Sequence, residues 1–539
     1  LKKVEMENKI KISEMIAIHL KNIGVQKVFG VPGGGSSLDL IDAFEKVDID
    51  FHLVKREDAA VIMASVFGEL TKSIGVALVT KGPGLSNSIN GIAYSSLDRS
   101  PLILFSDGFS DKLSSFVTHQ VFDQKKLMSP FSKNYTNLQN ENPEKEFKNI
   151  VANALIPPYG PVYIELISSV AQTIIENKNF EPNNDNADQS FSLDDKVISL
   201  IEKSRKPVII LGLENLIEDT SKTVAEIINI VNCPTLVTYK AKGVIPDEHR
   251  NLVGIFTGGK AEQISILDSD LIVLIGLDPV ELILQPWPYN ISVLNISLVN
   301  HETHYVSPNA NLIGNLSDNL EKIKTFFNKS DWMNSEIKNF KQTIKSKLIF
   351  PSNNKLNPQS IVELAQQYNK NPRISIDAGA HMFSATAFWK ALKPFDVLIS
   401  NGLATMGFAL PAAISSALAN PEKGTIAFTG DGGFMMCCSE LATAVQYNAN
   451  ILVIVFNDGA LSLIDIKQKS RNLKRSGTTW PRSNFAEVAN GFGCKSWKVE
   501  DISSYENALI EASNLKGPRL IDVWVDPDGY KEQLKSLRG

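Results

Sequence analysis

Short, continuously apolar runs alternate with longer helical stretches along the chain, and this alternation constrains the fold more than any other feature of the sequence. The strand-like runs are KVFGV (27–31), GVALVT (75–80), PLILFS (101–106), KPVIILG (206–212), TLVTY (235–239), DLIVLIG (270–276), RISID (373–377), GTIAFTG (424–430), ILVIVFND (451–458) and PRLIDVWVD (518–526). Continuous apolar strands are typical of parallel sheets whose two faces are both covered by helices. The sequence therefore predicts an α/β fold built from parallel β-sheets.

Two polar, Asn-rich stretches divide the chain into thirds. Residues 177–190 and 350–360 lack hydrophobic periodicity and carry Asn, Pro and Ser, so we predict that they are linkers. The length of 539 residues is that of three or four domains of about 150 residues each. We therefore predict three α/β domains, at 8–176, 192–348 and 358–530, of which the first and third share a pattern.

Charge and cysteine content exclude several classes of protein. The 54 basic and 59 acidic residues give a net charge of −5, so no basic excess marks a nucleic-acid or membrane-surface partner. Four cysteines without a CxxC pair are too few for a disulfide framework, and the adjacent Cys437 and Cys438 are expected in a buried helix. The charged first residues carry no apolar signal core, so the expected location is the cytoplasm.

One uncharged stretch, 402–419, is as long as a membrane span. Its Gly, Ala, Ser and Thr content and its central Pro411 favour a buried loop followed by a helix instead. We expect no membrane-spanning segment.

Four glycine-rich loops follow predicted strands, at 30–37, 80–87, 377–381 and 429–434. Ligands of open α/β sheets bind at the carboxyl ends of the strands, so four such loops favour a phosphate-bearing cofactor. None of them matches GxxxxGK[ST], and VFGVPGGG is not GxGxxG. A nucleotide-hydrolysing P-loop and a nicotinamide Rossmann site are therefore disfavoured.

Two aspartates form the strongest chemical pattern. Asp431 follows one predicted strand and Asp458 closes the next, 458 − 431 = 27 residues later, and the intervening 434–448 is predicted as one helix. A strand–helix–strand unit returns both strand ends to the same edge of the sheet. Two carboxylates there suit Mg²⁺ bridging a diphosphate. The alternative is that Asp431 caps the following helix and Asp458 forms a turn.

At this point the residues resemble a known family. GDGGFMM, ELATAVQYN and FND resemble the GDG…NN signature of thiamine diphosphate enzymes. Further segments resemble, in order, those of the acetolactate synthase and 2-keto acid decarboxylase superfamily, large catalytic subunit type: GVPGGG, REDAAVIMA, TKGPGLSNSINGIA, AKGVIPDEH and SNGLATMGFALPAAI. The resemblance implies a pyrimidine-binding N-terminal domain, a central Rossmann-like domain and a diphosphate-binding C-terminal domain.

The resemblance also implies cofactor and metal ligands. Asp431, Asp458 and the carbonyl of Ala460 correspond to the Mg²⁺ ligands, with Asp458 in place of the usual Asn. The implied contacts of the diphosphate and the aminopyrimidine are Gly379, Ala380, His381, Gly430, Gly432, Gly433, Gly402, Ala404 and Met406, and the implied cofactor site also includes Val31, Pro32, Gly33, Leu461 and Ser462. Gly433 replaces a common Ser. Met406 corresponds to the apolar wedge that bends the cofactor, although a Met in an apolar stretch is usually core.

Glu57 corresponds to the catalytic glutamate of the family. There it hydrogen-bonds the pyrimidine ring nitrogen and promotes removal of the thiazolium C2 proton. Without the resemblance, a charge in the first turn of a helix would be the simpler interpretation. Arg56 stands where His is frequent. In the family this glutamate and the diphosphate site come from different subunits, so a homodimer or dimer of dimers is expected.

The resemblance leaves the reaction open. Gln120 matches a glutamine of acetolactate synthases, and His119 replaces an aromatic residue, either as a proton relay or as a surface histidine. We expect an enzyme that decarboxylates a 2-keto acid such as pyruvate and transfers the acyl unit to a carbonyl acceptor. The alternatives are a 2-keto acid decarboxylase, a 2-hydroxyacyl-CoA or acyloin lyase, a catalytically silent binding subunit and a flavin- or nicotinamide-dependent oxidoreductase.

Other positions depart from the biosynthetic synthases. Lys467 stands where their second-substrate Trp occurs, and GLDPVELIL (276–284) lacks the Arg of flavin-binding members, which puts FAD binding in doubt. The paired histidines of pyruvate decarboxylases and a basic patch for a CoA nucleotide are not found.

Overall fold

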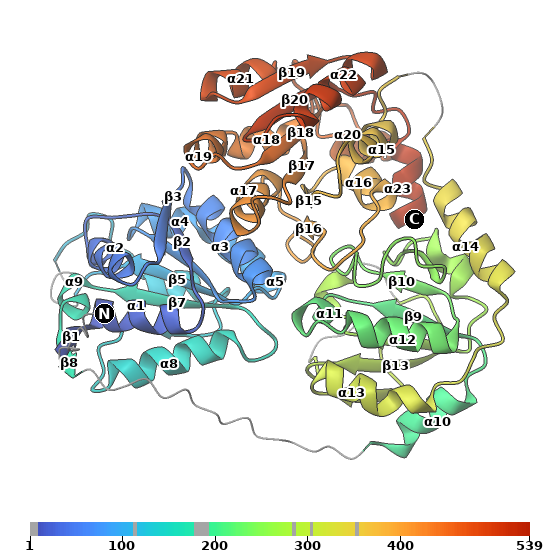
Figure 1. Ribbon diagram of the computed structural model, residues 1–539, viewed down its shortest axis with the longest axis horizontal. Helices are drawn as coiled ribbons and strands as arrows, with labels where there is room; N and C mark the ends of the chain where they lie inside the picture. Colours follow the sequence, from blue (N-terminus) through green and yellow to red (C-terminus); the bar gives the residue numbers. More distant parts are fainter. Residues whose placement is uncertain are drawn as a thin grey trace. The chain divides into compact units, whose positions relative to one another are not determined.

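The computed structural model describes residues 9–110, 116–176, 193–282, 287–301, 306–350 and 355–538. The predicted linker at 177–190 lies outside the described residues, as does the 351–354 part of the second one. Three six-stranded sheets make up the framework, and every strand pair within them is parallel. Helices flank each sheet (Figure 1). The predicted α/β class with parallel sheets is confirmed.

The first sheet has the order β3-β2-β4-β5-β7-β6. Its strands are β2 (Lys27–Val31), β3 (Asp50–Leu53), β4 (Gly75–Val79), β5 (Leu102–Asp107), β6 (Tyr135–Thr136) and β7 (Pro161–Leu166). The helices of this part are α1 (Ile12–Asn22), α2 (Ser36–Lys46), α3 (Glu57–Thr71), α4 (Pro83–Asn87), α5 (Ile89–Leu97), α7 (Gln124–Met128), α8 (Pro143–Ala154) and α9 (Ser168–Ala171). A separate antiparallel pair joins β1 (Lys9–Lys11) to β8 (Ile174–Glu176).

The central sheet has the order β11-β10-β9-β12-β13-β14. Its strands are β9 (Pro207–Leu211), β10 (Thr235–Val237), β11 (Leu252–Ile255), β12 (Leu271–Ile275), β13 (Ser292–Ser297) and β14 (Ala310–Ile313). Its α-helices are α10 (Asp195–Lys203), α11 (Glu214–Ile217), α12 (Ser221–Val231), α13 (Leu316–Ile323) and α14 (Asn334–Ser346), with short 3₁₀ turns η1 (Glu262–Ser265), η2 (Pro279–Glu281) and η3 (Lys324–Phe326).

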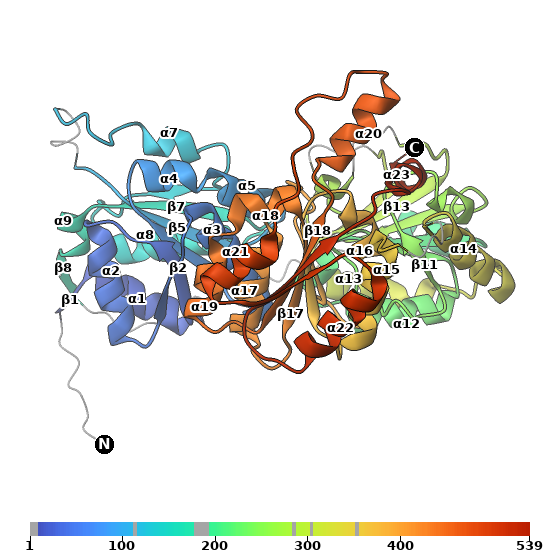
Figure 2. The ribbon, with the colours of Figure 1, turned by 90° about the horizontal axis from the view of Figure 1, so that it is seen from above.

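The third sheet has the order β16-β15-β17-β18-β20-β19. Its strands are β15 (Arg373–Ile376), β16 (Val397–Ile399), β17 (Thr425–Gly430), β18 (Ile451–Asn457), β19 (Lys495–Val499) and β20 (Arg519–Trp524). The helices of this part of the chain are α15 (Pro358–Tyr368), α16 (His381–Phe388), α17 (Ala409–Ala419), α18 (Asp431–Cys437), α19 (Glu440–Gln446), α20 (Ser462–Ser470), α21 (Phe485–Phe492), α22 (Ile502–Ser513) and α23 (Tyr530–Arg538). Helix α20 stands out from its sheet (Figure 2).

Strand order fixes where ligands can bind. When strands are numbered along the chain within each sheet, the first and third sheets both read 2-1-3-4-6-5, and the central sheet reads 3-2-1-4-5-6, the Rossmann order. In open parallel sheets, ligands bind outside the carboxyl ends of the strands at which the order reverses. These points lie between β2 and β4, between β9 and β12, and between β15 and β17. The four predicted glycine-rich loops follow β2, β4, β15 and β17, the strands on either side of the first and third of these points.

By its contacts the chain divides into two compact units. The first unit contains the first sheet together with residues 414–421 and 439–447, and the second contains the central and third sheets. Within the first unit, the Ser415 hydroxyl donates to the carbonyl of Met63 in α3 at 2.7 Å. Glu440 accepts a hydrogen bond from the amide of Lys55, at the start of the same helix, at 3.1 Å. Two short segments from late in the sequence therefore pack against α3.

Two expectations about helices need correction. Residues 434–448 form two helices, α18 and α19, instead of one, and Cys438 lies between them, half-buried. The remaining cysteines are buried, and all four are free. The stretch 402–419 forms a loop and helix α17, as expected, and none of the helices in the described ranges is long and apolar enough to cross a membrane.

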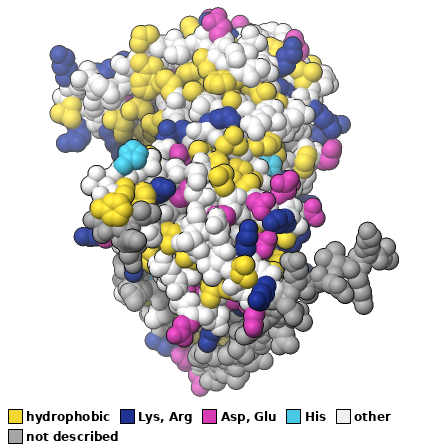
Figure 3. All heavy atoms as spheres, turned by 90° about the vertical axis from the view of Figure 1, so that its left-hand side faces the viewer, with side chains coloured by type: hydrophobic (Ala, Val, Ile, Leu, Met, Phe, Trp, Pro, Cys, Tyr) yellow, Lys and Arg dark blue, Asp and Glu magenta, His cyan; other side chains and the backbone are white. Residues whose placement is uncertain are grey.

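The surface carries both signs of charge. On the face that Figure 3 shows, basic and acidic side chains are interspersed, and hydrophobic side chains lie between them. This pattern agrees with the small net charge of −5.

Candidate functional site

A cavity of about 210 Å³ lies at the reversal point of the third sheet. The loops after β15, β17 and β18 form its wall, together with residues of the 404–406 loop and of α20. It brings together most of the residues predicted for this part of the chain: Gly379, Ala380, His381, Ala404, Met406, Gly430, Asp431, Gly432, Gly433, Asp458, Ala460, Leu461 and Ser462. Gly402 is not among the lining residues.

Asp431 joins two of these loops. It follows β17 directly, its side chain is 2% exposed, and its two carboxylate oxygens accept from the amides of Gly432 and Gly459, each at 2.8 Å. Gly459 has a φ of +69°, which a residue with a side chain rarely adopts, so glycine permits this tight turn after β18. The capping position of α18 is Gly430, so the simple helix-cap interpretation of Asp431 is wrong.

Asp458 has the contacts of a turn and also lines the cavity. Its Oδ1 accepts from the amide of Ala460 at 3.1 Å, and its Oδ2 accepts from the hydroxyl of Ser462. Burial, and next the charge of Asp458, raise the pKa of Asp431 to about 7. Burial also raises the pKa of Asp458. A cation beside both carboxylates would offset their repulsion and favour the ionised forms.

His381 lines the same cavity and carries a buried polar atom. The ring is 3% exposed, and its Nε2 has no hydrogen-bond partner among the described residues. Burial lowers the pKa of His381 to about 4, so the ring is neutral near pH 7. A buried polar atom without a partner costs free energy, which a polar ligand in the cavity would recover.

The 404–408 loop is held by a buried carboxylate. Asp377 accepts from the amides of Gly407 at 3.1 Å and Phe408 at 3.0 Å, and burial raises its pKa to about 6. Ala404 in this loop has a φ of +52°, an unfavourable value for a residue with a side chain. Such strain persists only where surrounding contacts maintain it, and it is enriched at functional sites.

Tyr530 is a cavity residue that the sequence did not indicate. It begins α23, is 2% exposed, and packs edge-to-face on Phe350 with 5.8 Å between ring centroids. Gln533 of the same helix donates to the carbonyl of Leu348 and accepts from the Ser384 hydroxyl. The C-terminal helix therefore contributes to the wall.

The first unit holds the remaining predicted residues. Val31 ends β2, and Pro32 and Gly33 follow it at the reversal point of the first sheet. Asp107, at the end of β5, accepts from the amide and hydroxyl of Ser37 at 2.7 and 2.8 Å. A Cβ on Gly33 would lie 2.0 Å from Asp107 Oδ2, so only glycine permits this approach.

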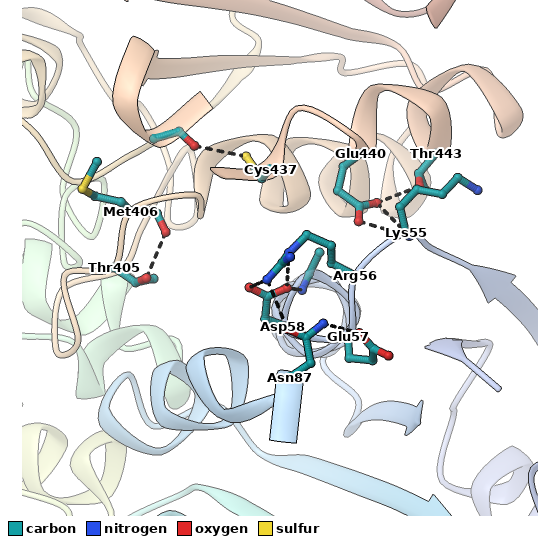
Figure 4. A network of polar contacts seen from close by, with 12 residues as sticks. Lys55, Arg56, Glu57, Asp58, Asn87, Thr405, Met406, Cys437, Glu440 and Thr443 are labelled. Carbon is teal, nitrogen blue, oxygen red and sulfur yellow. Dashed lines mark hydrogen bonds and ion pairs between the residues drawn. The ribbon is translucent and has the colours of Figure 1, made fainter. Parts of the chain in front are cut away.

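Glu57 is the first residue of α3 and is half-buried. Its Oε2 accepts from the side-chain amide of Asn87, the last residue of α4 (Figure 4). Arg56 donates to both carboxylate oxygens of Asp58 and to the Asn87 oxygen. Asn87 is the last residue of the glycine-rich loop 80–87, whose sequence pattern did not indicate this contact with Glu57.

His119 and Gln120 lie on an exposed segment of the first unit. Gln120 has a φ of +61°, and its backbone approaches Gly82, on which an added Cβ would lie 2.9 Å from the Gln120 carbonyl oxygen. The neighbouring Gln124 is buried and accepts from the Gly82 amide at 2.8 Å. Gln124 therefore fixes this loop, a role that the sequence did not reveal.

The reversal point of the central sheet is acidic. Glu214, Asp278 and Glu281 follow β9 and β12 and are all buried. His301 contacts Glu214 at 3.1 Å, and one ligand atom each from Glu214, Asp278 and His301 lie within 4.8 Å of one another. Burial raises the pKa of Glu214, and it raises that of Glu281 to about 8.

Glu281 is expected to make the central sheet less stable at alkaline pH. Its pKa is raised from 4.5 to about 8, so the folded protein binds this proton more tightly than the unfolded chain does. The stabilisation is therefore full below pH 4.5 and is lost as the pH rises through about 8. Glu281→Gln should be more stable than the wild type at pH 9, by at most about 5 kcal/mol.

The measurement is the midpoint of thermal unfolding between pH 4 and 9. Glu202→Gln, at an exposed position of α10, serves as the control. A Glu281→Gln midpoint that falls with pH as steeply as that of the wild type would contradict the assignment.

Comparison with known proteins agrees with this architecture. Three family models of thiamine pyrophosphate (thiamine diphosphate, TPP) enzymes match the sequence. They are the N-terminal TPP-binding domain at residues 10–127, the central domain at 195–323 and the C-terminal TPP-binding domain at 377–523. The chain is 26% identical to the acetolactate synthase of Bacillus subtilis, over 95% of this chain and 93% of that protein.

Two further relatives are similar over nearly their whole length. The chain is 27% identical to a probable acetolactate synthase large subunit of Methanococcus aeolicus, over 93% of this chain and 90% of that protein. It is 26% identical to the acetolactate synthase isozyme 3 large subunit of Escherichia coli, over 96% and 95%. The chain belongs to the thiamine pyrophosphate enzymes, as an enzyme of the acetolactate synthase type.

Proposed function

We propose that the cavity of the third sheet holds the diphosphate of thiamine diphosphate through Mg²⁺, with Asp431, Asp458 and the Ala460 carbonyl as protein ligands. The observation that carries this proposal is a pair of carboxylates, the buried Asp431 and the half-buried Asp458, that line one cavity at a reversal point of a parallel sheet. Carboxylate and carbonyl oxygens are the ligands that Mg²⁺ prefers, and phosphate and water complete its coordination. The donor set therefore fits the ion.

The remaining lining residues fit the organic part of the cofactor. His381 Nε2 and the amides around Gly379, Ala380, Gly432 and Gly433 would meet the diphosphate. The carbonyls of Gly402 and Ala404 and the amide of Met406 would meet the aminopyrimidine, with the Met406 side chain as an apolar support. The bound cofactor supplies an electron sink for breaking a C–C bond beside a carbonyl.

Glu57 would act on the pyrimidine ring from a partner subunit, next to Val31, Pro32 and Gly33. We infer a homodimer or dimer of dimers whose active sites are completed at the subunit interface. Exposed Met435 and Met436 on α18, 41% and 55% accessible, support a partner near the cavity, because large apolar side chains are costly in water. We also propose domain boundaries at 8–176, 192–348 and 358–530.

The proposed reaction is decarboxylation of a pyruvate-like 2-keto acid followed by transfer of the acyl unit to a carbonyl acceptor. Leu461 and Ser462 would form the substrate side of the cavity, and Gln120 and His119 would act on the acceptor. A simple decarboxylase or a 2-hydroxyacyl-CoA or acyloin lyase is the alternative. We infer that FAD is not required, because Glu214, Asp278 and Glu281 occupy the edge where a dinucleotide diphosphate would lie.

The product of pyruvate turnover tests this proposal. The protein is incubated with thiamine diphosphate, Mg²⁺ and ¹³C-labelled pyruvate, and the products are identified by NMR. We expect acetolactate, in which a new C–C bond joins two labelled units. Acetaldehyde alone would support the decarboxylase, and unchanged pyruvate with bound cofactor would contradict the choice of pyruvate as donor.

A further inference from the structure

A chain of polar contacts ends at one carboxylate oxygen of Glu57, Oε2 (Figure 4). Arg56 Nε and Nη2 donate to the two oxygens of Asp58 at 3.1 and 3.3 Å. Arg56 Nη2 also donates to Asn87 Oδ1 at 3.2 Å. Asn87 Nδ2 in turn donates to Glu57 Oε2. All four residues belong to the first compact unit.

Arg56 determines which way the Asn87 amide faces. An asparagine side chain has one accepting and one donating end, and either end can in principle face a given neighbour. A guanidinium has donors only, so the Asn87 oxygen must face Arg56. The amide nitrogen of Asn87 must then face Glu57, where it can only donate. Asp58 accepts two hydrogen bonds along one edge of the planar guanidinium, which gives the contact a fixed direction.

We propose that Arg56 and Asn87 are positioning residues that confine the exchangeable proton of Glu57 to Oε1. A proton on Oε2 would compete with the Asn87 N–H for the lone pairs of that oxygen and make it a poorer acceptor. Oε1 is the atom left for the pyrimidine nitrogen of the cofactor. This inference rests on the proposed function, in which Glu57 exchanges a proton with that nitrogen.

The surroundings of Oε1 agree with this division of roles. Gly84 lies beside it, and a Cβ on Gly84 would already be 3.4 Å from Oε1. The same Cβ would lie 2.7 Å from the Thr80 Cγ2 methyl, so glycine at 84 leaves room between Thr80 and Oε1. One carboxylate oxygen is thus engaged by a donor, and the other faces a residue without a side chain.

An arginine makes this arrangement insensitive to pH. The charged groups that act on Arg56 are Asp58, Glu57 and Glu440, and their hydrogen bonds and charges, led by those of Asp58, raise its pKa. The guanidinium therefore remains a donor throughout the working range. A histidine, which is frequent at this position in the family that the sequence resembles, loses its charge near pH 6.5. Its neutral ring can present either a donor or an acceptor to Asn87.

The test compares Asn87→Asp, Arg56→Lys, Arg56→His and Glu57→Gln with Asn153→Asp, at a half-buried position on α8 in the same unit. Two readouts are used. The first is the infrared carbonyl band of the protonated Glu57 carboxyl in the cofactor-free protein, obtained as a difference from Glu57→Gln. The second is exchange of the cofactor C2 proton with D₂O in the loaded enzyme.

In Asn87→Asp a second carboxylate replaces the donor and disfavours the ionised form of Glu57. The band of the protonated carboxyl should therefore persist to a pH about 1–2 units higher than in the wild type. The exchange rate should fall about 100-fold. Arg56→Lys keeps a cationic donor but loses the two-point contact with Asp58, so exchange should fall less than in Asn87→Asp. Arg56→His should add a step near pH 6.5 to the pH profile of exchange. Because the Arg56 side chain is 40% exposed, these two variants should fold normally.

Two outcomes would overturn the inference in different ways. If Asn87→Asp and Arg56→His match Asn153→Asp in both readouts while Glu57→Gln loses exchange, the positioning role is wrong and the proposed role of Glu57 stands. If Glu57→Gln itself keeps wild-type exchange, the proposed function of Glu57 is wrong, and this inference falls with it.

Discussion

Glu57→Gln is expected to lower the turnover number about 1,000-fold and to leave cofactor affinity within about threefold. Gln has nearly the same shape, and it can still accept from Asn87 through its oxygen. It cannot supply or take up a proton at the position of Oε1. The loss should therefore fall on the chemical step and spare binding, which is the signature of a residue that acts in the transition state.

The measurement is kcat together with the dissociation constant of thiamine diphosphate in the presence of Mg²⁺. Glu45→Gln, at an exposed position of α2 in the same unit, makes the same chemical change away from the site and should behave as the wild type. A Glu57→Gln enzyme with a normal turnover number would contradict the proposed role.

The two metal-ligand candidates are expected to respond differently to replacement by Asn. Both oxygens of Asp431 accept from backbone amides, so an Asn at 431 would turn its NH₂ group toward one of those donors and lose a hydrogen bond as well as a charge. We expect Asp431→Asn to weaken metal binding at least about 100-fold, because an unsatisfied buried group adds to the lost ligand charge.

Asp458→Asn is expected to strengthen binding of the cofactor diphosphate. The family that the sequence resembles usually has Asn here, and Asn keeps an oxygen that can serve as a ligand. It also removes a charge that raises the pKa of Asp431. We expect metal affinity within about fivefold of the wild type and tighter binding of the diphosphate, since like charges repel.

Mn²⁺ titration followed by electron paramagnetic resonance measures both variants directly, first without and then with thiamine diphosphate. The two variants are matched controls for each other, because each exchanges one carboxylate for an amide in the same cavity. Equal losses in both variants would contradict the unequal roles.

Much of the sheet framework could be predicted from the sequence because of how parallel sheets are built. The strands that the apolar runs identified include β2, β4 and β5 of the first sheet and β9, β10 and β12 of the central one. These are interior strands, buried on both faces, and they therefore read as continuous apolar runs. Edge strands such as β19, KSWKV, have partly exposed side chains and no such signature.

The order of strands and the break between α18 and α19 could not be read in the same way. Order depends on which crossover each helix makes, and apolar periodicity does not encode that choice. The segment 434–448 has continuous helical character. Glu440 in its middle nevertheless belongs to the first unit, where it accepts a hydrogen bond from the amide of Lys55 just before α3. Tertiary contacts of this kind override local propensity.

The site was predicted where a motif carries the chemistry and missed where only the fold does. Asp431 and Asp458 were found because each ends a strand of the same sheet. Asn87 lies at the end of the glycine-rich loop 80–87, but its contact with Glu57 depends on how α4 packs beside α3. Tyr530 lies far in sequence from the motifs of its cavity, and its position depends on how α23 packs.

The anomalous scattering of Mn²⁺ in crystals grown with thiamine diphosphate tests whether the metal binds in the cavity of the third sheet. We expect a peak about 2 Å from oxygens of Asp431, Asp458 and Ala460, with the diphosphate on its open side. A peak at Glu214, Asp278 and His301 instead, with none in the cavity of the third sheet, would contradict it.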